Sequence, residues 1–210
     1  MSRARKTVPI GLLVALTLAG AGCGGDETTS PPPPPTEAAQ KLPKLPKHWK
    51  AHRDLSIGYA IGKPPGWEAT RSRAGGVTAA LIRSPDHLLA VTLVATRDPE
   101  ALSVPLEEFA TTALGALPGF EARLKPSTPR PFPGTPLDAV QSVAHGTTKA
   151  RGIKERATLL VLRRDEIVNY TVAIVENARR GYSAKDRAVA LRMMRTLRDQ
   201  PVRPGAPEPD

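Results

Sequence analysis

The sequence predicts an α+β domain with a mostly antiparallel sheet and two principal helices. Strand-like segments outnumber helical ones, and several are joined by short turns, as in hairpins. Two other segments repeat apolar residues at helical spacing. We expect eight or so strands in one domain over residues 48–199, a length that can bury a core without disulfide bonds.

Alternation of apolar with polar residues identifies the strands. In the clearest example, Ile57, Tyr59 and Ile61 alternate with small or polar residues. Turns rich in proline, glycine and aspartate separate several of these segments and favour antiparallel pairing. The expected strands lie around residues 57–61, from Trp67 onward, and at residues 77–82, 88–96, 120–125, 138–145, 155–162 and 167–176.

Two segments carry helix signals. Residues 104–117 have Glu107 and Glu108 in the first turn, where the helix dipole favours acids. Ser183 is the expected N-cap of the second helix, with Asp186 at the capping-box position three residues later. The apolar residues of this second helix recur at helical spacing and should dock on the sheet: Ala190, Leu191, Met194 and Leu197.

Residues 1–22 have the features of a lipoprotein signal peptide. Three basic residues precede an apolar run, residues 8–21, which is too short to span a bilayer. Small residues then lead to Cys23, the single cysteine of the chain. An ordinary secreted protein is the alternative, but an unpaired cysteine is a liability in an oxidising compartment. We therefore predict that Cys23 is lipidated.

The predicted lipid places the protein on the outer face of the cytoplasmic membrane, after export by the secretory signal. Two acyl chains, such as palmitate, anchor a protein stably where one is marginal. Residues 23–47 include Pro31–Pro35 and are expected to form an extended tether. Whether the tether is glycosylated stays open. Residues 200–210 are rich in proline and are expected to be disordered.

The sequence shows no recognisable catalytic, cofactor or metal motif, and we expect a protein that is not an enzyme and has no cofactor. His48 and His52 are four residues apart, but no third metal ligand is evident. The alternative is an envelope hydrolase or transferase with a dispersed active site, in which His145 or His87 acts as the base. Trp67 is interpreted as a core residue, with ligand stacking as the alternative.

The positive net charge of the chain suggests an anionic partner. The net charge is +10, and Lys149, Arg151, Lys154 and Arg156 cluster within eight residues. For a tethered domain, natural anionic partners are phospholipid headgroups and envelope polymers. Scattered, solvated charge from arginine enrichment is the alternative. Nucleic acid is not an expected partner, because the chain has few aromatic residues and is predicted to leave the cytoplasm.

The order of elements and several short motifs resemble the PsbP-like fold family, particularly actinobacterial lipoproteins of the LpqN type. The resemblance covers residues 49–198. Its motifs are Pro64–Trp67, Leu106–Phe109, Asn169–Val172 and Arg195–Arg198. It implies an antiparallel sheet packed with helices, in proteins that bind or scaffold rather than catalyse. We therefore expect a lipid-anchored accessory protein that contacts an envelope protein or an anionic polymer.

Overall fold

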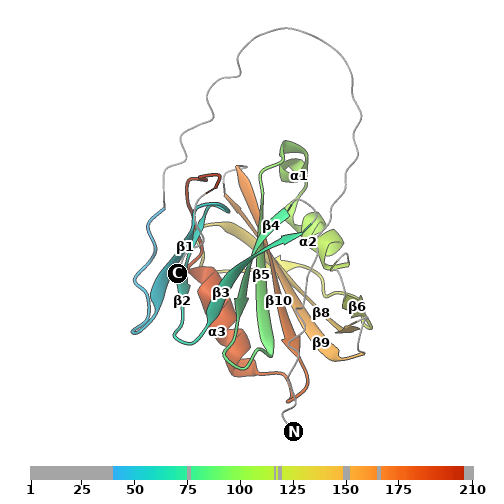
Figure 1. Ribbon diagram of the computed structural model, residues 1–210. Helices are drawn as coiled ribbons and strands as arrows, with labels where there is room; N and C mark the ends of the chain where they lie inside the picture. Colours follow the sequence, from blue (N-terminus) through green and yellow to red (C-terminus); the bar gives the residue numbers. More distant parts are fainter. Residues whose placement is uncertain are drawn as a thin grey trace.

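The computed structural model describes residues 40–74, 77–115, 117, 120–148, 152–164 and 167–205. Cys23, the predicted signal peptide, Lys149 and Arg151 lie outside these residues. The described chain forms two antiparallel sheets and three helices (Figure 1). The predicted α+β class with a mostly antiparallel sheet is therefore confirmed.

The larger sheet contains most of the predicted strands. Its strands are β3 (Glu68–Ala74), β4 (Val77–Arg83), β5 (Leu89–Thr96), β6 (Phe120–Ala122), β7 (Arg130–Pro131), β8 (Asp138–Thr148), β9 (Lys154–Arg164) and β10 (Val168–Asn177). Their order is β3-β4-β5-β10-β9-β8-β6, with β7 also paired to β8. The predicted hairpins β4–β5 and β9–β10 are both present.

The smaller sheet has the order β1-β2-β11 and was only partly expected. It contains β1 (Lys50–Asp54), β2 (Tyr59–Lys63) and β11 (Arg198–Asp199). β1 lacks apolar alternation, because its two buried residues are His52 and Asp54. Polar residues thus occupy the inward positions of β1, where apolar residues usually make a strand recognisable from sequence.

The helices follow local capping chemistry. The helix expected at residues 104–117 is present as α2 (Leu106–Gly115), and a short helix that was not expected, α1 (Pro99–Ser103), precedes it. Asp98 caps α1 by accepting a hydrogen bond from Glu100 N at 2.9 Å. α3 (Ala184–Arg195) begins as predicted, since Ser183 Oγ accepts from Asp186 N at 3.1 Å. These bonds satisfy amide groups that have no acceptor inside the helix.

The core has two layers, one on each face of the larger sheet. The first cluster includes the smaller sheet and α3, together with the even-numbered β9 residues Leu160 and Leu162. The second includes α2 and the odd-numbered residues Leu159 and Val161. Since successive strand residues point to opposite faces, β9 is buried on both sides and reads as a continuous apolar run. Trp67 belongs to the first cluster and is 6% exposed.

Both ends of the described chain are bonded to the fold. Gln40 N donates to Asp199 O at 3.1 Å, and Gln200 N donates to Gly58 O at 2.9 Å. Arg203 N donates to a loop carbonyl, Leu55 O, at 2.7 Å. The folded domain therefore extends beyond the predicted limits of 48 and 199, to at least Gln40 and Arg203.

Candidate functional site

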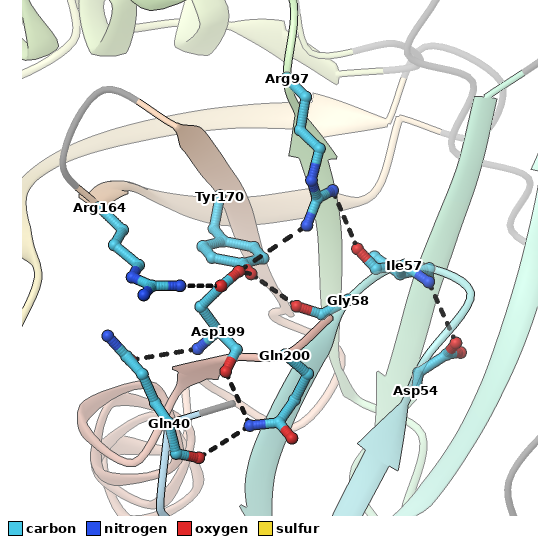
Figure 2. Close-up of polar contacts among 9 residues, drawn as sticks. All are labelled: Gln40, Asp54, Ile57, Gly58, Arg97, Arg164, Tyr170, Asp199 and Gln200. Atoms are coloured by element: carbon cyan, nitrogen blue, oxygen red, sulfur yellow. Dashed lines mark hydrogen bonds and ion pairs between the residues drawn. The ribbon is translucent and has the colours of Figure 1, made fainter. Parts of the chain in front are cut away.

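A buried carboxylate, Asp199, holds the first of two charged clusters (Figure 2). Arg164 Nη1 and Tyr170 Oη both donate to this carboxylate, and Arg97 Nη2 lies 3.7 Å from it. Arg97 also donates to Ile57 O at 3.1 Å. A carboxylate without solvent is stable only with such charged partners. The partners come from the sheet around it, so this cluster is part of the core.

The Asp199 cluster also joins the start of the described chain to its end. Gln40 Oε1 accepts from Asp199 N at 3.3 Å, and Gln200 Nε2 donates to Gln40 O at 2.8 Å. Figure 2 shows these side chains around β11. The charged groups of this cluster pair with one another. We therefore interpret the cluster as a structural link that holds Gln40 against the core.

The ion pair of Asp54 and Arg71 links β1 to β3 in a similar way. Arg71 Nε lies 2.6 Å from Asp54 Oδ2, and both side chains are at most 10% exposed. Burial alone would raise the pKa of Asp54. Hydrogen bonds from Arg71, Ser56 and Ile57 outweigh it, so the pKa lies below its usual value. This pair is likewise internal to the fold.

The second cluster lies at the opposite end of β9 and β10 and faces α3. We call it the Glu176 cluster; its members are His145, Arg156, Glu176, Tyr182 and Arg187. The sheet register places His145 opposite Arg156, and Arg156 opposite Glu176. Directly opposed residues share a face of a sheet, so the three side chains form a row across β8, β9 and β10.

Glu176 is the buried acid of this row, with 2% exposure. Its Oε2 accepts from Arg187 Nη1 at 3.3 Å and lies 3.9 Å from Arg156 Nη1. Burial raises its pKa, Arg156 opposes the shift, and Asp186 adds to it. Oε1 has no hydrogen-bond partner in the described part of the chain. Glu176 also lines a small surface hollow with Ser183 and Asp186.

Arg156 is held between this acid and an aromatic ring. Its guanidinium carbon lies 4.5 Å from the centroid of Tyr182, and His145 meets the same ring edge-on at 5.7 Å. Arg156 Nε and Thr158 Oγ1, the next residue on this face of β9, are buried without a hydrogen-bond partner among the described residues. The cluster therefore combines a fixed, partly exposed cation with buried polar atoms that lack a hydrogen-bond partner among the described residues.

The structure describes two of the four predicted basic residues. Lys154 is exposed and shares a face of β9 with Arg156, which is half-buried against Glu176. Lys149 and Arg151 lie outside the described residues. Three members of the cluster were not predicted from the sequence: Glu176, Tyr182 and Arg187. They belong to β10, a turn and α3; the register of β9 against β10 could have indicated Glu176 but not the other two.

The four histidines do not meet. His87 is exposed in a turn with φ 57°, while His145 contacts the Tyr182 ring. His48 is exposed, and His52 is buried 6.0 Å from the ring of Tyr59. In the ranges that the structure describes, neither His87 nor His145 hydrogen-bonds to a carboxylate or hydroxyl group. The described part of the chain as a whole contains no group of three His, Cys, Asp or Glu side chains that could hold a metal ion.

None of the helices in the described ranges combines the length and apolar character needed to cross a membrane. No family model and no curated protein sequence matches the chain.

Several solved structures are similar to this chain at low sequence identity. A protein from Bacteroides thetaiotaomicron has 14% identity and a TM-score of 0.47 over 73% of this chain, which spans about half (49%) of that protein. A mutant of the protein Mog1 has 13% identity and a TM-score of 0.44, covering 73% of this chain and 96% of Mog1. LpqN of Mycobacterium tuberculosis, described as involved in cell envelope biogenesis, has 13% identity and a TM-score of 0.32, covering 77% and 83%. These similarities concern the fold alone.

Proposed function

We propose that this protein is a lipid-anchored, non-enzymatic binding protein of the LpqN type, exposed on the outer face of the cytoplasmic membrane. Cys23 carries the anchor, and the Glu176 cluster contacts an envelope partner. The observation that supports this function best is the Arg156 guanidinium, which stacks on Tyr182 and pairs only loosely, at 3.9 Å, with Glu176.

An arginine stacked on a tyrosine loses little conformational freedom on binding, because its planar donor group is already oriented. Arginine and tyrosine are also enriched among the residues that dominate binding energies at interfaces. Lys154 lies two residues away on the same face and adds an exposed positive charge. Together these groups suit an anionic or hydroxyl-rich partner.

The partner in this proposal is an envelope protein or an anionic envelope polymer. Arg156 and Arg187 can donate hydrogen bonds to its acceptors, while the Tyr182 ring offers an apolar face. The chemistry of these groups is recognition: they donate hydrogen bonds and stack, and none of them is a typical nucleophile.

Affinity capture of the native protein from membranes tests the proposal. Lys154→Glu reverses an exposed charge and Tyr182→Ala removes the ring, while Arg203→Glu is a matched exposed control away from the cluster. We expect one partner to be retained by the wild type and by Arg203→Glu, and lost by the other two variants. Identical captured material from all four proteins would contradict a binding role for the Glu176 cluster.

A further inference from the structure

A lysine recurs at every third residue where the described chain begins. We call Lys41, Lys44, Lys47 and Lys50 the lysine ridge. Leucine–proline pairs separate the first three lysines. Three residues is the repeat of polyproline II, which rises ~3.1 Å per residue, so such a segment presents Lys41, Lys44 and Lys47 along one edge about 9 Å apart. A turn with His48 at φ 71°, in which Trp49 N donates to Pro46 O at 3.1 Å, then leads to Lys50 at the start of β1.

Burial in this segment follows the same period. Lys41, Lys44 and Lys47 are exposed, whereas the residues between them are all half-buried: Leu42, Pro43, Leu45 and Pro46. The leucines and prolines therefore face the domain, and the lysines face outward. Figure 1 shows this segment running beside β1 and β2.

Close packing fixes the ridge to the smaller sheet. A Cβ added at Gly62 of β2 would lie 2.6 Å from Leu45 Cδ2 and 3.2 Å from Trp49 Cε3, so glycine allows this close approach. Gln40 hydrogen-bonds to β11 at the start of the segment. The guanidinium of Arg192 lies 5.8 Å from the Trp49 ring at its other end. The ridge is thus part of the folded domain.

The adjoining strands carry further positive charges, on both faces of the smaller sheet. The register of β1 and β2 places Lys50 directly opposite Lys63. Like charges in this position repel each other, and Arg53 is exposed on the same strand as Lys50. The one acid in residues 40–63 is Asp54, which is buried and paired with Arg71. No carboxylate within this segment is left to neutralise the lysines.

We propose that the lysine ridge docks the domain on the anionic phospholipid headgroups of the membrane that holds its anchor. This inference rests on the proposed anchor at Cys23. In chain order, the ridge is the first described segment after that cysteine, so a short tether delivers it to the membrane. Charge complementarity selects the headgroups, since a lysine near an anionic bilayer gains roughly five-fold in binding. An ammonium group can pair with phosphate without a fixed geometry.

The native tryptophans report docking. Trp49 and Trp67 are the two tryptophans of the chain, and Trp67 is buried in the core. The purified native protein is incorporated into vesicles that carry a dansyl-labelled headgroup, made of phosphatidylcholine with or without phosphatidylglycerol. We expect greater energy transfer from Trp49 when phosphatidylglycerol is present. The increase should disappear near 1 M salt, where charges are screened over ~3 Å.

Two triple variants distinguish an effect of the lysine ridge on docking from an effect of the overall positive charge of the domain. Lys41→Gln, Lys44→Gln and Lys47→Gln together should shift the docking equilibrium about 100-fold toward the undocked state, at roughly five-fold per lysine. The control combines three exposed basic residues elsewhere, in Arg123→Gln, Lys125→Gln and Lys185→Gln, and should leave transfer unchanged. Equal transfer in both vesicle types, or equal loss in both triple variants, overturns the proposal.

Flotation distinguishes the docking from the anchor. A native protein that does not float with phosphatidylcholine vesicles contradicts the anchor at Cys23. The same unanchored protein still tests the ridge, because it should float with phosphatidylglycerol vesicles only while the three lysines are present. Failure of that lysine-dependent flotation contradicts the docking itself.

Discussion

Tyr170 donates its single hydroxyl proton to the Asp199 carboxylate and so connects β10 to β11 through the core. Tyr170 Oη also lies 2.7 Å from Gly58 O, but that carbonyl already accepts from Gln200 N at 2.9 Å. A carboxylate is the stronger acceptor, and it therefore receives the tyrosine proton. This bond joins the two sheets and helps to fix the end of α3, which immediately precedes β11.

Tyr170→Phe should lower the free energy of unfolding by about 2 kcal/mol, because a buried charged acceptor loses one donor. Urea denaturation measures the loss. Tyr59→Phe is a matched control, since the buried Tyr59 hydroxyl has no hydrogen-bond partner among the described residues and its removal should cost little. Equal losses in the two variants would show that the bond to Asp199 contributes nothing specific.

Asp54→Asn should cost about 3 kcal/mol at neutral pH, because it leaves Arg71 without its buried partner. The pKa of Asp54 lies below its usual value of 3.8, so its contribution is present above that pH. It is lost as the pH falls through the lowered pKa, where the folded protein must also protonate. Unfolding free energies across this acid range should therefore converge for the two proteins. A difference in unfolding free energy that does not change with pH would show that the Asp54 carboxylate is not its source.

Glu155→Gln should stabilise the protein at neutral pH. Burial raises the pKa of Glu155 above its usual value of 4.5, and a hydrogen bond with Thr148 offsets only part of this effect. Above the raised pKa, the folded state must hold a charge that burial disfavours; below pH 4.5, the side chain is neutral in both states. The gain in denaturant midpoint should shrink as the pH approaches 4.5. A variant less stable than wild type at neutral pH would contradict this account.

Gly146→Ala should destabilise the pairing of β6 with β8. The added Cβ would lie 2.2 Å from Glu121 O and 2.6 Å from Phe120 Cζ, so the strands must move apart at a cost of about 1–3 kcal/mol or more. Gly181→Ala is the control: its φ is +84°, but no atom lies within 4 Å of the added Cβ. The Gly146 variant should show the larger fall in unfolding free energy.

Local signals predicted those parts of the fold whose chemistry is contained in a few neighbouring residues. The cap of α3 at Ser183 and the hairpin of β9 with β10 are of this kind. β1 was missed because His52 and Asp54, its buried residues, are polar and satisfied by groups distant in sequence. The lysine ridge was read as a spacer, because proline in a linker and proline packed on a sheet look alike unless the period of three is noticed.

The candidate site was predicted less completely than the fold. Strand alternation is sufficient to place Lys154 and Arg156, two residues apart, on one face of β9. It could not supply Glu176, since one shifted residue in the β9–β10 turn changes every cross-strand partner. Tyr182 and Arg187 come from the segment around the start of α3, and their approach to β9 depends on how the helix docks.

Cys23 provides the most direct test of the proposed function. Intact-mass analysis of the protein extracted from membranes should give a chain that begins at Cys23 and carries a diacylglyceryl group. Cys23→Ser should release the protein into the medium or leave an uncleaved precursor. A membrane-bound Cys23→Ser protein of mature size, or a native mature chain with an unmodified Cys23, would contradict the lipid anchor and the docking built on it.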